Sequence, residues 1–221
     1  MSALQNVEHS YEAELVRKAI HLSSLSIPIV YFLITKSAAL TILVPLTLVF
    51  LVADIGRLFH TPTRILFDRY FGWLLRVHER NNETRRLNGA TYVLLSATVC
   101  IWVFPKVIAI SAFAILIVSD TAAALIGRKY GRHPFLKKSL EGALAFLVTA
   151  LIVIGLAPKA EYRFAEYLIG AIAALAGAVV EALTIAIDDN LSIPIVLAGV
   201  MWILYIVLLP NVNVFALDAM R

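Results

Sequence analysis

Residues 106–127 read KVIAISAFAILIVSDTAAALIG, and this stretch decides the class of fold. Its residues 107–119 contain no Asp, Glu, Lys, Arg or His, and Asp120 follows them directly. A helix needs about 20 residues to cross a bilayer, so a span built on this run has to continue past Asp120. Ionisable side chains inside a membrane are costly and mark a functional site by default. The stretch therefore predicts a membrane helix that carries a functional carboxylate.

The composition of the whole chain supports a membrane protein. Of its 221 residues, 61% are hydrophobic and 15% are charged, and the mean hydropathy is +0.86. Soluble domains are about 45–50% apolar and about 25% charged, so this composition excludes a disordered chain and argues against a soluble globule. The single cysteine, Cys100, excludes an internal disulfide and a metal site built from cysteines.

Uncharged runs predict an all-α bundle of about seven transmembrane helices in one integral-membrane domain, residues 1–221. We expect these helices at residues 16–35, 37–54, 88–105, 107–127, 139–157, 165–187 and 191–209. Just as the fourth helix has to include Asp120, the first has to include His21 and the sixth has to include Glu181 to be long enough to cross the bilayer. The connection 57–86 is predicted to hold an amphipathic helix that starts at Thr61-Pro62 and lies in the cytoplasmic interface.

The distribution of basic residues predicts the orientation. With the N-terminus in the cytoplasm, 14 of the 19 Lys and Arg residues fall on the cytoplasmic side. Cytoplasmic loops carry the excess of Lys and Arg, so we expect the N-terminus inside and the C-terminus outside. The predicted polar clusters then all lie at the cytoplasmic ends of the helices, and the loops on the opposite side are short and nearly featureless. This segregation predicts one polar site open to the cytoplasm.

The residue types at that side indicate the chemistry. The carboxylates are Asp120, Glu141, Glu181 and Asp189, and a basic segment between the fourth and fifth helices contains Gly127, Gly131 and Gly142. Mg²⁺ takes one or two carboxylates and leaves positions for phosphate oxygens. Lysines, arginines and free backbone N–H groups can neutralise phosphates. The combination favours a divalent cation with a polyphosphate, and the absence of a Walker A sequence excludes a P-loop site.

Four motifs stand in order along the chain. They are Glu14-Leu-Val-Arg17-Lys18-Ala-Ile-His21, Asp120-Thr-Ala-Ala-Ala-Leu-Ile-Gly127-Arg128-Lys-Tyr-Gly131-Arg-His, Lys138-Ser139-Leu-Glu141-Gly142, and Glu181-Ala-Leu-Thr followed by Asp189-Asn190-Leu-Ser-Ile-Pro194. As a set they resemble the motifs of the membrane lipid-alcohol kinases, the family of dolichol kinase, phytol kinase and CTP-dependent diacylglycerol kinase. This family is distantly similar to phosphatidate cytidylyltransferase.

The resemblance implies an enzyme that moves the γ-phosphate of CTP, or of another nucleoside triphosphate, to the hydroxyl of a polyprenol, dolichol, phytol or diacylglycerol. It implies Mg²⁺ as cofactor, held by Asp120 and Glu181. The catalytic residues would be Asp120 with Asp189 or Glu141, and either of the last two could accept the hydroxyl proton. The nucleotide-binding residues that it implies are Arg17, Lys18, His21, Gly127, Arg128, Gly131, Lys137, Lys138, Ser139, Gly142 and Asn190.

Two other functions remain open at this point. A CDP-lipid-forming cytidylyltransferase would use the same metal and CTP with a phosphorylated lipid. A proton or cation transporter would also need carboxylates in membrane helices, but it predicts polar residues through the full depth of the bilayer. We expect a lipid, a nucleotide and the membrane as partners and no nucleic acid, and the sequence leaves a homo-oligomer open.

Overall fold

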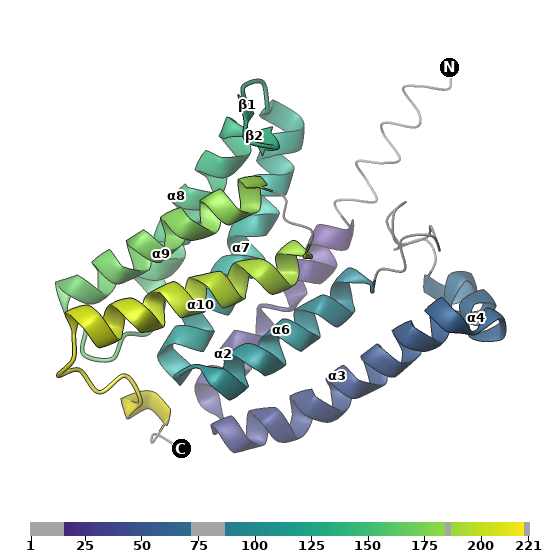
Figure 1. The fold of residues 1–221 in the computed structure, drawn as a ribbon, viewed down its shortest axis with the longest axis horizontal. Coiled ribbons are helices and arrows are strands. Elements are labelled where there is room, and N and C mark those ends of the chain that lie inside the picture. Colours follow the sequence, from purple (N-terminus) through teal and green to yellow (C-terminus); the bar gives the residue numbers. More distant parts are fainter. Residues whose placement is uncertain (1–15, 72–86, 184–186, 219–221) are drawn as a thin grey trace.

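The computed structural model describes residues 16–71, 87–183 and 187–218, and these residues are mainly helical (Figure 1). Residues 16–23 are helical. The further helices are α2 (Ser26–Leu33), α3 (Lys36–Phe59), α4 (Thr61–Phe71), α6 (Gly89–Val103), α7 (Lys106–Tyr130), α8 (Leu140–Leu156), α9 (Phe164–Leu183), α10 (Asp189–Leu208) and the 3₁₀ turn η2 (Ala216–Asp218). Between α7 and α8 lies a two-stranded hairpin, β1 (Pro134–Phe135) and β2 (Lys138–Ser139).

These helices confirm the predicted helical membrane bundle. Four of those in the described part of the chain, α3, α7, α9 and α10, are long and apolar enough to cross a membrane. Helices α6 and α8 are apolar but shorter. The described part of the predicted amphipathic connection is the end of α3 and the short helix α4, which begins at the expected Thr61-Pro62. Residues 72–86 lie outside the described residues.

The first predicted helix is the main difference, because a turn at Ser24-Leu25 divides it. The turn is closed by backbone hydrogen bonds to the residue three positions earlier, from Ser24 N to His21 O and from Leu25 N to Leu22 O, both 3.0 Å. Pro28 explains the interruption. Its nitrogen has no hydrogen to give to the carbonyl four residues earlier, and its ring would clash with that carbonyl.

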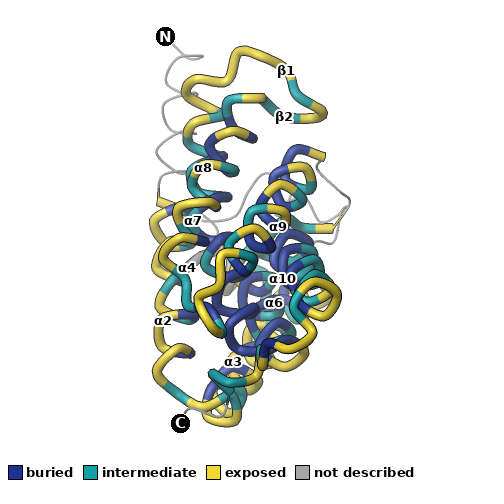
Figure 2. The backbone as a smooth tube through the Cα atoms, turned by 90° about the vertical axis from the view of Figure 1, so that its left-hand side faces the viewer, coloured by how far each residue is buried: buried dark blue, intermediate teal, exposed yellow. Residues whose placement is uncertain are grey.

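Helix α7 is the centre of the bundle. In the 18-residue apolar stretch of α7, 72% of the residues are buried, against 22% in the corresponding stretch of α3. It packs against α2, α6, α8 and α10, whereas α3 packs on α6 and α4. Figure 2 shows the buried positions in the interior and exposed positions along the outside. Large apolar side chains such as Val52, Leu156 and Val207 lie on that outer surface, as a lipid-facing surface requires.

The connectivity brings several helix ends to one side of the molecule. In Figure 1 the C-terminal ends of α3 and α9 and the N-terminal ends of α6 and α10 are the right-hand ends of these helices. These ends carry Asp54, Asn88, Glu181 and Asp189. The fold therefore places polar residues from distant parts of the chain at a common level.

The opposite ends of the helices are less featureless than predicted. Glu166 is buried there and its carboxylate accepts hydrogen bonds from Ala160 N (2.7 Å), Arg163 N (2.8 Å) and the hydroxyl of Tyr205 (2.8 Å). Lys159 is also buried and donates to the carbonyl of Ile154, 2.6 Å away, near the end of α8. The sequence could not show this cluster, because its polar groups serve the backbone of a connecting loop.

Candidate active site

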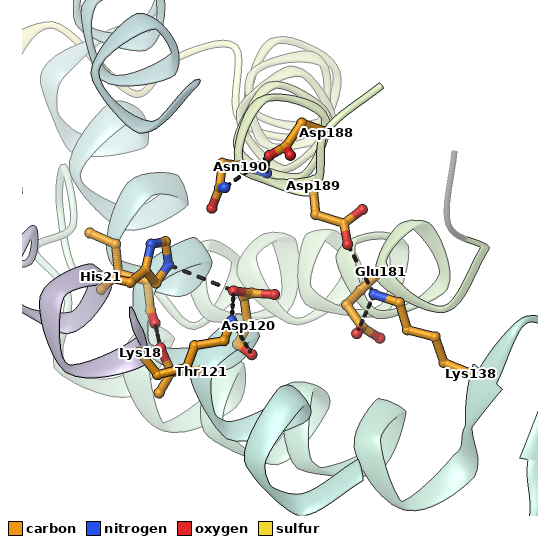
Figure 3. Close-up of polar contacts among 10 residues, drawn as sticks. Lys18, His21, Asp120, Thr121, Lys138, Glu181, Asp188, Asp189 and Asn190 are labelled. Carbon is orange, nitrogen blue, oxygen red and sulfur yellow. Dashed lines mark hydrogen bonds and ion pairs between the residues drawn. The ribbon is translucent and has the colours of Figure 1, made fainter. Parts of the chain in front are cut away.

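The first polar contact of the site joins the start of the chain to α7. Lys18 and His21 lie one helical turn apart, and the Lys18 ammonium donates to Oδ2 of Asp120. His21 Nε2 lies 3.7 Å from the same oxygen. Figure 3 shows the other carboxylate oxygen of Asp120 turned away from this pair. Asp120 is only 8% exposed, and a buried charge is costly unless it is paired. The buried Lys18 balances the charge of Asp120.

The second contact joins three other segments through Lys138. Its ammonium, on β2, donates to Oε1 of Glu181 at 2.7 Å and to Oδ2 of Asp189 at 2.9 Å. Burial disfavours the charge of Lys138, but the neighbouring carboxylates Asp189 and Glu181 outweigh this effect and raise the pKa of Lys138 above its ordinary value. Lys138 therefore stays protonated at neutral pH and links the end of α9 to the start of α10.

These two contacts are neighbours. In Figure 3, Asp120 lies between the Lys18–His21 pair on one side and Lys138 and Glu181 on the other. Asp120 is close enough to Glu181 and Asp189 for the negative charges to repel each other. We call these side chains, Lys18, His21, Asp120, Lys138, Glu181 and Asp189, the charged cluster.

The hairpin explains how Lys138 reaches the cluster. Strands β1 and β2 are antiparallel, with Phe135 opposite Lys138. The turn between them puts Leu136 at a φ of 53°, in the left-handed region that bulky residues seldom adopt. The backbone N–H of Lys137 donates to the carbonyl of Ala182 at 3.1 Å. This bond holds the hairpin against the end of α9, one residue from Glu181.

The small residues near the hairpin have a packing role. Ser139 caps α8, and its Oγ accepts a hydrogen bond from Gly142 N at 3.2 Å. A Cβ added at Gly127 would lie 3.1 Å from Ser139 Oγ and 3.4 Å from Gly142 Cα. Glycine suits this crossing because α7 and α8 approach closely there, and a Cβ would require Ser139 to shift. These three residues support the site, and none of them belongs to the charged cluster.

Glu141 lies apart from the charged cluster. Its Oε1 is 2.7 Å from Nδ1 of His133 and accepts from His133 N at 3.2 Å, which closes the loop before the hairpin onto the first turn of α8. The structure therefore brings together His21, Asp120 and Asp189, but it places the carboxylate of Glu141 against His133.

The remaining predicted nucleotide-binding residues lie in the segments that carry the cluster or directly follow them. Arg17 is half-buried beside Lys18, and Arg128, Gly131 and Lys137 are exposed at the end of α7 and in the hairpin. Asn190 lies in the first turn of α10, where its Nδ2 donates to Oδ1 of Asp188 at 2.8 Å.

The described side chains do not by themselves supply enough ligands to hold a metal ion. In the described part of the chain, no group of three or more His, Cys, Asp or Glu side chains is arranged to hold a metal ion. However, Oε2 of the buried Glu181 has no hydrogen-bond partner among the described residues. A buried carboxylate oxygen left in this way is costly and calls for a ligand or water. The site fits a hard cation such as Mg²⁺ if phosphate oxygens supply most of its ligands.

Sequence reasoning missed a second buried ion pair near this side of the bundle. Arg57 and Asp54 are almost fully buried and joined by contacts of 2.8 and 2.9 Å, and Asp54 also accepts from Asn88 N at 2.6 Å. The spacing of three residues at a helix end was the available signal. The pair attaches α3 to the start of α6.

Comparison with known proteins finds two relatives of this chain. The chain is 31% identical over 187 residues to the uncharacterized protein RP860 of Rickettsia prowazekii, which covers 84% of this chain and 91% of the relative. It is 30% identical over 153 residues to CTP-dependent diacylglycerol kinase 1 of Schizosaccharomyces pombe, covering 63% of this chain and 68% of that protein. The chain belongs to the lipid-kinase-like family that contains these two proteins. No profile of a known protein family and no solved structure matches it.

Proposed function

We propose that this protein is a membrane lipid kinase that phosphorylates the hydroxyl group of a lipid alcohol with CTP or another nucleoside triphosphate. The observation that carries the proposal is the charged cluster, in which two lysines hold three carboxylates that lie within or at the ends of apolar helices. The relative's name supports CTP as donor and diacylglycerol as acceptor. A polyprenol, dolichol or phytol offers the same single hydroxyl on an apolar tail.

In the proposed reaction the lipid hydroxyl oxygen attacks the γ-phosphorus. The bond from that phosphorus to the bridging oxygen breaks, and the nucleoside diphosphate leaves. Phosphoryl transfer depends mainly on positioning and on neutralising charge. Lys138 and the exposed Lys137 and Arg128 bind the triphosphate from the aqueous side. Mg²⁺, held by Asp120 and Glu181, would neutralise charge on the phosphates.

The structure favours Asp189 over Glu141 as the acceptor of the hydroxyl proton. Asp189 belongs to the charged cluster, whereas the carboxylate of Glu141 is held by His133. A general base has to lie within hydrogen-bond reach of the proton that it removes. We therefore assign the proton to Asp189.

We also propose that the cluster faces the cytoplasm, with the N-terminus inside and the C-terminus outside. The excess of Lys and Arg on the cluster side of the predicted topology supports this orientation. Nucleoside triphosphates are cytoplasmic, so a kinase site has to open to that side.

The test is an assay of the purified protein in detergent with CTP or ATP, with and without Mg²⁺, and with a panel of lipid alcohols. We expect a lipid monophosphate and a nucleoside diphosphate to form with at least one alcohol. Formation of pyrophosphate and a CDP-lipid from a phosphorylated lipid would identify a cytidylyltransferase instead. No turnover with any nucleotide and lipid would contradict the enzyme assignment.

A further inference from the structure

The two lysines of the charged cluster differ in how freely they can move. The side chain of Lys18 is 6% exposed and bonds both the carboxylate and the backbone carbonyl of Asp120. The side chain of Lys138 is 30% exposed and comes from a hairpin at the surface. Lys138 can therefore turn toward solvent and change partners, whereas the ammonium of Lys18 is buried and cannot.

The charge of Lys138 also stands beside the position proposed for the metal ion, because both would contact Glu181. It contacts Glu181 at 2.7 Å and Asp189 at 2.9 Å, so its positive charge stands where the two carboxylates converge. A divalent cation on Glu181 would be strongly repelled by an ammonium at this distance. Yet Lys138 satisfies only one oxygen of Glu181, and the buried Oε2 remains without a hydrogen-bond partner in the described residues. Glu181 is thus built for a second ligand that Lys138 excludes.

We propose that Lys138 blocks the metal position until a nucleotide arrives, and then moves its charge from the two carboxylates to the triphosphate. Glu181 becomes available to the cation and Asp189 to the hydroxyl proton in the same movement. The divalent cation then binds only together with nucleotide, which prevents occupation of the site by metal alone. This inference rests on the proposed function for the identity of the nucleotide.

The experiment measures protein-bound Mn²⁺ by equilibrium dialysis of the full chain in detergent, with and without CTP. The variants are Lys138→Met, which keeps length and removes charge, and Lys138→Arg, which keeps charge. Lys129→Met is the matched control, because Lys129 lies over the ring of its neighbour Tyr130, 5.3 Å from the ring centroid, outside the charged cluster. Circular dichroism verifies that each variant keeps its helices.

We expect the wild type, Lys138→Arg and Lys129→Met to bind Mn²⁺ tightly only when CTP is present. Lys138→Met should bind Mn²⁺ without CTP at least about tenfold more tightly than the wild type, the change that losing one charged competitor produces. Equal Mn²⁺ affinity of the wild type and Lys138→Met without CTP would overturn the blocking role and leave the kinase proposal standing. A gain in Lys138→Met, with no effect of CTP on the wild type, would support the block and contradict nucleotide binding.

Discussion

At the scale of single residues, the surroundings of a buried carboxylate decide its role. Asp54 and Asp120 are both buried and both paired with a cation. Both oxygens of Asp54 are satisfied, one by Arg57 and one by Asn88 N. Asp120 uses Oδ2 for Lys18, and its other oxygen is turned away from Lys18 and His21. We therefore expect Asp54 to stabilise the fold and Asp120 to take part in the reaction.

Changing Asp120 to Asn should lower kcat by about 100-fold or more, because charge stabilisation at a reaction centre has this size. Its amide keeps the shape and a hydrogen-bond acceptor for Lys18, so the chain should still fold, with some loss of stability because the buried charge of Lys18 is no longer balanced. The matched control is Asp54→Asn, which should lower the free energy of unfolding by about 3 kcal/mol while the folded fraction keeps its kcat. Steady-state kinetics and denaturation in detergent measure both. Full activity of Asp120→Asn would refute the site.

Substitutions of Asp189 and of Glu141 should differ in their effect on kcat. Asp189→Asn should lower kcat by about 100-fold if Asp189 takes the hydroxyl proton. Glu141→Gln should leave kcat close to that of the wild type, because the carboxylate of Glu141 serves the loop through His133. Kinetics with a saturating lipid acceptor makes the comparison, and the reverse order of effects would assign the proton to Glu141.

The residue types of the site were predictable, but their partners were not. Asp120, Glu181 and Asp189 follow from charges in or beside apolar runs, which the sequence displays directly. The choice of Lys138 for Glu181 and Asp189, and of His133 for Glu141, depends on the hairpin. No local pattern encodes those distances.

At the scale of elements, apolar runs predicted most helices and missed the parts fixed by tertiary contacts. Hydrophobic length is a local property, so α7 and α10 were found within a few residues of their observed limits. The β1–β2 hairpin was not predicted, because strands of two residues have no detectable alternation. A contact with the end of α9 holds it instead, from Lys137 N to Ala182 O.

A substitution at the start of α8 tests whether Ser139 stabilises the helix or binds the triphosphate. Ser139 was assigned to the triphosphate, yet its hydroxyl caps α8. Ser139→Ala should lower the free energy of unfolding by about 1 kcal/mol, the usual loss for an N-cap. We expect no change in the KM for nucleotide. A raised KM with unchanged stability would restore Ser139 to the phosphate site.

At the scale of the whole molecule, both ends of the bundle hold buried charges, but among the described residues the carboxylate oxygen without a hydrogen-bond partner lies at the end that carries the charged cluster. At the far end, Glu166 receives four hydrogen bonds and holds a loop against α10. At the end that carries the charged cluster, Glu181 keeps an oxygen without a hydrogen-bond partner in the described residues. The sequence could predict charges near helix ends, but it could not show which were satisfied, since satisfaction depends on packing.

The proposed orientation predicts which residues a membrane-impermeant thiol reagent reaches. The natural Cys100 is fully buried, so it should not react. A cysteine introduced by Arg132→Cys, at an exposed position between α7 and β1, should be labelled only from the cytoplasmic side. A cysteine at exposed Glu161, in the far loop, should be labelled only from outside. Labelling of intact cells and of inverted vesicles makes the measurement, and the opposite pattern would reverse the topology.

The most direct test of the central claim follows the phosphate itself. Purified protein in detergent is given diacylglycerol, Mg²⁺ and CTP labelled either at the γ-phosphate or at the α-phosphate, with Asp120→Asn as the inactive control. The account predicts that the lipid product carries the γ label and never the α label, and that Asp120→Asn gives neither. A lipid that carries the α label, or γ transfer by Asp120→Asn at the wild-type rate, would contradict it.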